Sequence, residues 1–268
     1  MLREFLRTLV VDCPPWARRL GLAHENAAIN GRHGRRRAAW ASHLAASREA
    51  ILAATARCAR RERVLVIGAG DCLDVPVAGL AAQFAEIILA DVVLSPAARR
   101  LARRYRGCVR GVQWDATGAL ATLAAVRRTV QAADARHIFE TADAGPSLGG
   151  EPDLVVSANC LSQLGLVPAH SLPAAREDES LPDRCAAAAA RRHLGWLAAR
   201  VGVRVLVADV ARLDLAPDGH VLKRENLLGR FGLRTPDRAW RWDLAPIPEW
   251  SRDFHRVHEV GAWFDGPR

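Results

Sequence analysis

The sequence contains no apolar run close to the roughly 20 residues that a membrane-spanning helix needs, which argues against membrane insertion. The apolar stretch in its first residues is also too short for a signal peptide. Only six cysteines occur in 268 residues, and no two of them form a C-x-x-C pair. Scattered cysteines are typical of a reducing compartment, so we expect a cytoplasmic protein without a metal centre.

Lysine is almost absent as well, because Lys223 is the one lysine among 38 basic residues. The formal charge is 38 − 29 = +9, a balance that fits a nucleic-acid partner. The same excess would follow from a GC-rich genome that favours alanine, arginine and glycine codons. We favour the genomic bias, and RNA stays open as a partner.

The composition is that of an ordinary globular protein, with 50% hydrophobic and 25% charged residues. A chain of 268 residues is long enough to bury a core without disulfides or metals. Its length predicts one large domain, or one domain with an appendage.

Short continuous apolar runs alternate with helical patterns after a helical first part. Runs of this kind are typical of strands that are buried on both faces of a parallel sheet. We therefore predict an α/β fold with a mainly parallel sheet and a β-rich end. The helical part covers residues 1–60, and the expected strands are 63–67, 86–90, 108–113, 153–157, 203–208, 239–243 and 255–264.

Glycines and polar residues follow the first four predicted strands. They are Gly68 and Gly70, then Asp91, Asp115 and Asn159. Ligands of open parallel sheets bind beyond the carboxyl ends of the strands, where these residues would meet. The glycines allow a ligand to approach the backbone, and a carboxylate can accept hydrogen bonds from ribose hydroxyls or an adenine amino group.

The motifs VLVIGAGDCLDV (64–75), IILADV (87–92), VQWDATG (112–118) and DLVVSAN (153–159) resemble those of class I S-adenosylmethionine (SAM)-dependent methyltransferases. The resemblance covers about residues 60–264. It implies a Rossmann-like fold with a mainly parallel seven-stranded sheet and an antiparallel C-terminal strand. On this interpretation, residues 1–60 form a helical N-terminal segment that acts as a substrate lid, and residues 61–268 form the SAM-binding domain.

The resemblance also implies a cofactor, SAM, and the residues that hold it. The glycine loop would line the methionine end, Asp91 would hold the ribose, Asp115 the adenine, and Asn159 would lie near the reactive methyl group. Trp114 could flank the adenine, although a tryptophan at a strand end is more often part of the core. The implied cofactor-binding set is Gly68, Ala69, Gly70, Asp91, Val92, Trp114, Asp115, Ala116 and Asn159.

A nicotinamide dinucleotide fold is the main rival. Its fingerprint needs a third small residue, where this chain has Leu73. Asp91 lies 91 − 70 = 21 residues after Gly70, which suits either cofactor. Asp115 and the β-rich end favour SAM.

The function that we predict is methyl transfer from SAM to an acceptor, with a small molecule favoured. RNA methylation and a SAM-binding regulatory or assembly protein without catalysis are the alternatives. We assign no catalytic residue. A tryptophan-rich C-terminal part would pack in the core or form the seam of a homodimer; its tryptophans are Trp240, Trp242, Trp250 and Trp263.

Some charged residues leave two interpretations open. The arginines at 32 and 35–37, with Trp40 nearby, could grip an anionic substrate or could be a solvated helix start. His170 and the acids at 177–179 lie where a catalytic base could stand, although a solvated loop is the simpler explanation. His255 and His258 point to opposite faces of a strand, so they are poor joint metal ligands.

Overall fold

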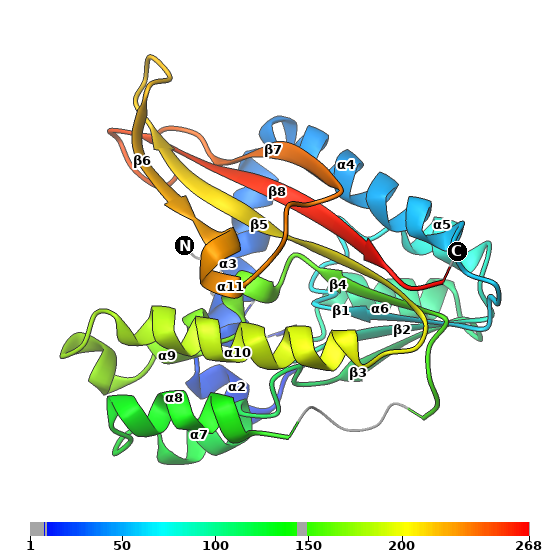
Figure 1. The fold of residues 1–268 in the computed structure, drawn as a ribbon, viewed down its shortest axis with the longest axis horizontal. Helices are drawn as coiled ribbons and strands as arrows, with labels where there is room; N and C mark the ends of the chain where they lie inside the picture. The colour runs from blue at the N-terminus through cyan, green and yellow to red at the C-terminus, as the bar shows by residue number, and fades with distance from the viewer. Residues whose placement is uncertain (1–7, 9, 144–148, 268) are drawn as a thin grey trace.

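A computed structural model describes residues 8, 10–143 and 149–267 and shows one sheet with helices on both faces (Figure 1). The strands follow the order β3-β2-β1-β4-β5-β8-β7, and β6 pairs with β5 beside this path. The predicted α/β class with a mainly parallel sheet is confirmed. The strands are β1 Arg63–Ile67, β2 Glu86–Asp91, β3 Val109–Gln113, β4 Leu154–Ala158, β5 Val203–Leu215, β6 Val221–Asn226, β7 Arg238–Ala245 and β8 His255–Asp265.

The first five strands are mutually parallel. Strand β8 runs antiparallel to β5 and is the predicted antiparallel C-terminal strand. The sheet has eight strands rather than the predicted seven. The difference comes from β5, which continues to Leu215 through an irregularity between Asp209 and Ala211 and thereby pairs with β6. Figure 1 shows β5 to β8 extending beyond the parallel strands as a long twisted arm.

Helices fill the connections between the strands. In Figure 1, α10 lies on one side of the sheet and α4 and α5 lie on the other. The α-helices are α2 Pro15–Arg19, α3 Leu22–Arg35, α4 Arg37–Thr55, α5 Val77–Ala81, α6 Pro96–Arg104, α7 Leu120–Val126, α8 Ala132–Thr141, α9 Leu166–His170, α10 Leu181–Ala198 and α11 Leu227–Phe231, with short 3₁₀ turns at Leu161–Gln163 and Pro173–Arg176.

Alternate residues of the central strands point into two separate cores. Val64 and Val66 of β1 pack with α4 and α5, whereas Leu65 and Ile67 of the same strand pack with α10 and α11. The apolar runs are therefore strands that are covered on both faces, which is why they lack a polar alternation.

The helical N-terminal segment divides into two parts. Helix α4 is a core helix, because Trp40, Ala50, Ile51 and Ala54 are at most 2% exposed and pack against the sheet. The shorter α2 and the longer α3 precede it and pack on other parts of the molecule. The predicted domain boundary at residue 60 thus separates α4 from a sheet that α4 covers.

The helix after the glycine loop is short, because α5 has five residues and begins only at Val77, directly after Pro76. Ser95 caps α6, since its Oγ accepts a hydrogen bond from Ala98 N–H at 3.1 Å. Across residues 8, 10–143 and 149–267, no helix is long and apolar enough to cross a bilayer.

Candidate functional site

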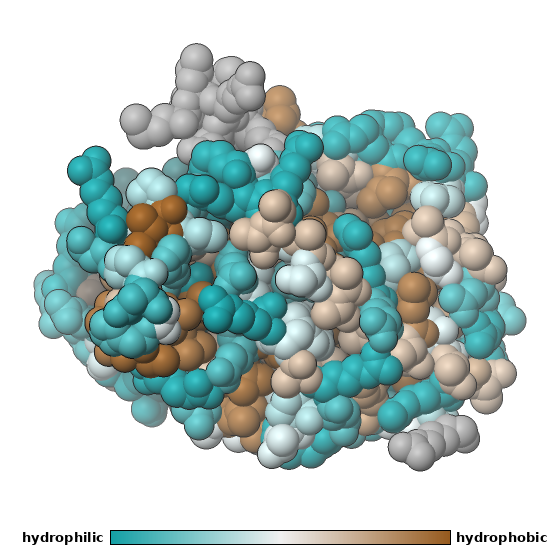
Figure 2. All heavy atoms as spheres, turned by 90° about the horizontal axis from the view of Figure 1, so that it is seen from above, coloured by the Kyte–Doolittle hydropathy of each residue, from teal (hydrophilic) through white to brown (hydrophobic). Residues whose placement is uncertain are grey.

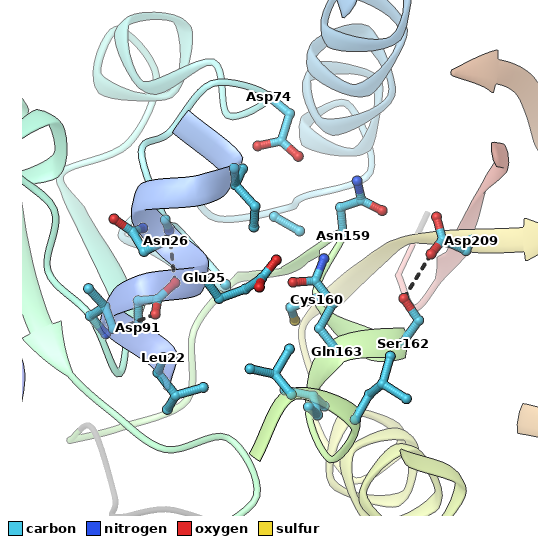
Figure 3. Close-up of a pocket in the computed structure, with 18 of the residues that line it drawn as sticks. Leu22, Glu25, Asn26, Asp74, Asp91, Asn159, Cys160, Ser162, Gln163 and Asp209 are labelled. Atoms are coloured by element: carbon cyan, nitrogen blue, oxygen red, sulfur yellow. Dashed lines mark hydrogen bonds between the residues drawn. The ribbon is translucent and has the colours of Figure 1, made fainter. Parts of the chain in front are cut away.

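A cavity of about 580 Å³ lies at the carboxyl ends of β1, β2, β3 and β4 and beside the middle of β5. Helix α3 covers part of it, and Figure 3 shows Leu22, Glu25 and Asn26 of this helix beside Asp91. All nine residues of the predicted cofactor-binding set line this cavity. The topology brings them together because parallel strands end at one edge of the sheet.

The glycine loop packs tightly against the end of β4. Gly68 has a φ of +73°, and a Cβ at this position would lie 2.7 Å from the Cβ of Cys160 and 2.9 Å from the carbonyl oxygen of Ala158. Gly70 also has a positive φ, +48°, but a Cβ there would meet only the carbonyl oxygen of Gly68 at 3.9 Å. The protein itself therefore excludes a side chain at Gly68 and leaves open space beside Gly70.

Asp91 links the end of β2 to the glycine loop. Its Oδ2 accepts a hydrogen bond from Gly70 N–H at 2.8 Å, and its Oδ1 accepts one from Val93 N–H at 3.0 Å. Burial raises the pKa of Asp91, while these backbone N–H groups oppose the change. Each carboxylate oxygen retains a lone pair for a further donor.

Asp115 accepts hydrogen bonds from residues that follow it in the chain, a structural role that the sequence did not reveal. Its Oδ1 accepts hydrogen bonds from the backbone N–H and the hydroxyl of Thr117, at 2.8 Å and 2.7 Å, and its Oδ2 accepts one from Leu120 N–H at 2.8 Å. These bonds satisfy free N–H groups at the start of α7, as a capping residue does.

Two further members of the set sit in tight surroundings. Trp114 is 3% exposed, and its ring lies 5.4 Å from that of Trp196, so most of this side chain belongs to the core. Asn159 has a φ of +51°, a left-handed backbone that is uncommon outside glycine, and its N–H donates to the carbonyl of Val207 at 2.8 Å. Backbone outliers of this kind cluster at functional sites.

Two acids directly after the glycine loop were not part of the predicted set. Asp71 and Asp74 line the cavity next to Gly70. Asp71 accepts a hydrogen bond from Asn30 at Oδ2, whereas its Oδ1 is buried without a hydrogen-bond partner among the described residues. Burial raises the pKa of Asp74, against the lowering effects of its own backbone N–H and of Arg48. Together with Asp91, these carboxyl groups make this end of the cavity acidic.

The opposite end of the cavity carries a buried acid–histidine pair that sequence reasoning missed. Asp209 Oδ1 lies 3.0 Å from His258 Nδ1, and the hydroxyl of Ser162 donates to Asp209 Oδ2 at 2.7 Å. In Figure 3, Asn159 and Cys160 lie between Asp91 on one side and Asp209 on the other. Asp209 ends an apolar strand pattern, as Asp91 does, and that signal could have found it.

A group of aromatic side chains begins next to His258. Trp242 lies edge-on to it with ring centroids 5.7 Å apart, and the same Trp242 stacks on His43 at 4.0 Å. Trp40 is edge-on to Trp242 at 4.8 Å. His258, Trp242, His43 and Trp40 all line the cavity, so Trp242 of the C-terminal part contributes to the cavity wall rather than only to the core.

The arginine cluster at 32–37 is tied mostly to the protein itself. Arg35 and Arg36 form ion pairs with Glu249 at 2.6 Å and 3.3 Å, and the Glu249 side chain is only 7% exposed. The Arg32 guanidinium lies over the ring of Trp250, 5.2 Å from its centroid. These contacts attach the end of α3 to the loop before β8.

The segment between β4 and α10 contains the candidates for a catalytic base that the sequence suggested, and His170 at the end of α9 is the one among them that lines the cavity. His170 lines the cavity, whereas Asp178 is paired with Arg184 at 2.6 Å and accepts the hydroxyl of Ser180 at 2.7 Å. Within the part of the chain that the structure describes, no group of three or more histidine, cysteine or acidic side chains could hold a metal ion.

Comparisons with known proteins give structural likeness only. No family model matches the chain, and neither does any curated protein. Matching solved structures include 1,6-didemethyltoxoflavin-N1-methyltransferase from Burkholderia thailandensis, with bound 1,6-didemethyltoxoflavin and S-adenosylhomocysteine; it is 21% identical over 90% of each chain, with a TM-score of 0.40. An O-methyltransferase family protein from the same organism is 14% identical over 83% of this chain and 55% of its own, with a TM-score of 0.32.

A third similar structure is CalS10, an amino pentose methyltransferase from Micromonospora echinaspora solved with SAM bound. It is 18% identical over 85% of this chain and 77% of its own, with a TM-score of 0.27. The chain's own strand order and register define its fold. Parallel strands β1 to β5, with β8 inserted antiparallel between β5 and β7, form a Rossmann-like α/β fold with the antiparallel C-terminal strand that the sequence resemblance implies.

Proposed function

We propose that this protein binds SAM in the cavity and transfers its methyl group to a small-molecule acceptor. The observation that carries the proposal is the acidic end of the cavity at the glycine loop, formed by Asp71, Asp74 and Asp91. SAM carries positive charge on its ammonium and sulfonium groups, whereas a dinucleotide carries a negative pyrophosphate. Carboxyl groups attract the first and repel the second.

The short α5 supports the same choice. Dinucleotide-binding folds place a helix N-terminus directly behind the glycine loop, where its free N–H groups hold the pyrophosphate. Here α5 begins at Val77, which is 77 − 70 = 7 residues after Gly70, and has only five residues. A pyrophosphate at this loop would therefore find acids in place of a helix N-terminus.

The cavity has groups that fit the ammonium group and the ribose of SAM. The buried Oδ1 of Asp71, which has no hydrogen-bond partner among the described residues, fits an ammonium group. Asp91 retains lone pairs for the ribose hydroxyls, and the backbone beside Gly70 is open to close approach. Bound SAM would supply an electrophilic methyl group, and the protein would contribute orientation and exclusion of water from the acceptor.

A small acceptor suits the surface better than RNA does. Several arginines are neutralised in pairs by one acid. Arg35 and Arg36 both pair with Glu249, and Arg63 and Arg110 both pair with Glu86. On the face in Figure 2, hydrophilic side chains are interspersed with apolar ones rather than gathered in one extended patch. RNA methylation would instead need free basic side chains along a track for the phosphates.

Substitution of Asp91 tests the placement of the ribose. We expect Asp91→Ala to weaken binding of S-adenosylhomocysteine about 10- to 150-fold, because hydrogen bonds to a charged group contribute roughly 1.5–3 kcal/mol. Titration calorimetry measures the loss, and the melting temperature shows whether the variant is folded.

Glu86→Ala is the matched control, since Glu86 begins the same strand at its other end and pairs with Arg63 and Arg110 outside the cavity. This variant should bind S-adenosylhomocysteine like the parent protein. Unchanged affinity in a folded Asp91→Ala protein would show that the ribose does not lie at Asp91.

A further inference from the structure

We propose that His258, oriented by Asp209, removes a proton from the acceptor during methyl transfer, and that the acceptor carries an O–H or N–H group on a planar ring. The inference rests on the proposed function and names its missing base and its class of acceptor. It starts from the juxtaposition of the two side chains in the wall of the cavity, at a distance of 3.0 Å between Nδ1 and Oδ1.

The pair is buried enough for its hydrogen bond to be strong. The side chains of His258 and Asp209 are 10% and 5% exposed. Burial raises the pKa of Asp209, but His258 and Arg212 outweigh it and bring the value to about 2. Asp209 is therefore ionised at neutral pH and accepts from the Nδ1–H of His258, which leaves Nε2 as the basic atom.

The basic atom of His258 is open toward the cavity. The one hydrogen bond of its ring in the described structure is the bond at Nδ1, and the ring lines the cavity. No atom of His258 is among the buried polar atoms without a partner. Nε2 is thus available to a group in the cavity, as a general base must be.

Asp209 is held in place from a second side. The hydroxyl of Ser162, in the turn after β4, donates to Asp209 Oδ2 at 2.7 Å. The β5 irregularity next to Asp209 also changes the register at this point of the strand. An acid that is fixed by two partners orients the imidazole of His258 and stabilises its protonated form.

His43 and His193 are less suited to accept a proton than His258. Trp240 Nε1 donates to His43 Nδ1 at 3.1 Å, and burial lowers the pKa of His43 to about 3. His43 is therefore a neutral ring that packs on Trp242. His193 lies outside the cavity lining and is paired with Ser157 at 2.9 Å.

The reaction needs one methyl donor, one acceptor and one base. A lone pair of the acceptor oxygen or nitrogen forms the bond to the methyl carbon, and the carbon–sulfur bond of SAM breaks, giving S-adenosylhomocysteine. The proton of the acceptor passes to His258 Nε2 and is later released to solvent. The ring of Trp242 beside His258, and that of Trp40 next to Trp242, line the cavity and favour a planar acceptor, since aromatic rings pack well against flat groups.

The test uses the full chain with labelled methyl-SAM and the small-molecule fraction of a host extract as acceptor pool. We expect His258→Gln to lower the rate of label transfer about 100-fold or more, with the affinity for S-adenosylhomocysteine unchanged. Asp209→Asn should also lower this rate, because the amide no longer stabilises the protonated ring. His220→Gln is the matched control: His220 is also bonded to an acid, Asp218, at 2.7 Å, but it is 62% exposed and outside the cavity lining.

A comparison of ligand affinity with reaction rate separates a base from a merely structural residue. A structural role of His258 would make His258→Gln lose affinity for S-adenosylhomocysteine together with activity. Loss of a base lowers the rate of methyl transfer and leaves this affinity as it is in the parent protein.

Each outcome decides between the proposals. Full activity of His258→Gln, or a loss of affinity for S-adenosylhomocysteine as large as the loss of rate, would overturn the role of His258 as the base. Binding of S-adenosylhomocysteine by the parent protein without any labelled small molecule would overturn the proposed transfer to a small molecule, and with it the base and the acceptor class. Failure of the parent protein to bind S-adenosylhomocysteine would overturn the SAM site itself.

Discussion

A chain that begins at Ala56 will not fold. It lacks α4. The side chains of this helix cover one face of the sheet and pack there against side chains of β1, β4, β5 and β7. Large buried side chains contribute about 2–5 kcal/mol each, and whole domains are stable by only about 5–15 kcal/mol. The loss of Trp40, Leu44 and Ile51 alone therefore removes an amount of stabilisation comparable to the whole free energy of unfolding.

Circular dichroism and thermal melting of the shortened chain provide the measurement. We expect no cooperative transition, and a melting curve like that of the full chain would contradict the core role of α4. The lid hypothesis needs a different cut, since residues 1–60 are not one unit. A chain that begins at Arg36 retains α4 and removes α2 and α3, which include the cavity residues Glu25 and Asn26.

We expect Gly68→Ala to be the most damaging single substitution in the glycine loop. The left-handed backbone costs a residue with a side chain about 1–2 kcal/mol, and overpacking adds roughly 1–3 kcal/mol. The added Cβ would stand 2.9 Å from the carbonyl oxygen of Ala158, so neither the loop nor β4 can give way cheaply. The melting temperature should fall by at least about 5 °C.

Gly70→Ala is the control for this prediction. Its added Cβ meets only the carbonyl oxygen of Gly68 at 3.9 Å, so the strain is confined to the backbone, and the protein should stay folded. If Gly70→Ala loses affinity for S-adenosylhomocysteine in the folded state, the loss reports a ligand that approaches the backbone there. Equal melting temperatures for Gly68→Ala and the parent protein would contradict the close packing of the loop against Cys160.

The sequence was sufficient to predict the parallel half of the fold. Strands buried on both faces leave apolar runs such as 63–67, and acids at their carboxyl ends mark the edge where ligands bind. The same logic predicted that the nine proposed cofactor-binding residues lie together, and all nine line one cavity, because this prediction depends on topology rather than on side-chain detail.

The remaining features depend on contacts that no local pattern records. The length of β5 follows from its pairing with β6 and β8, both distant in the sequence. Helix α4 would have the same apolar stripe whether it covered a pocket or a sheet, so the stripe alone does not place it in the core. The partnership of Asp209 with His258 spans 49 residues and exists only through the pairing of β5 with β8.

Asp115 shows how one residue can satisfy two interpretations. Its position after β3 predicts an adenine contact, yet its oxygens also accept the N–H groups of Thr117 and Leu120. A capping bond leaves lone pairs available on each oxygen, so the cap fixes the carboxylate without excluding a ligand.

Titration calorimetry with S-adenosylhomocysteine and, in parallel, with NADH tests the central claim most directly. The acidic glycine loop and the late start of α5 at Val77 predict tight binding of S-adenosylhomocysteine and much weaker binding of NADH. Tight binding of NADH without binding of S-adenosylhomocysteine would contradict the account.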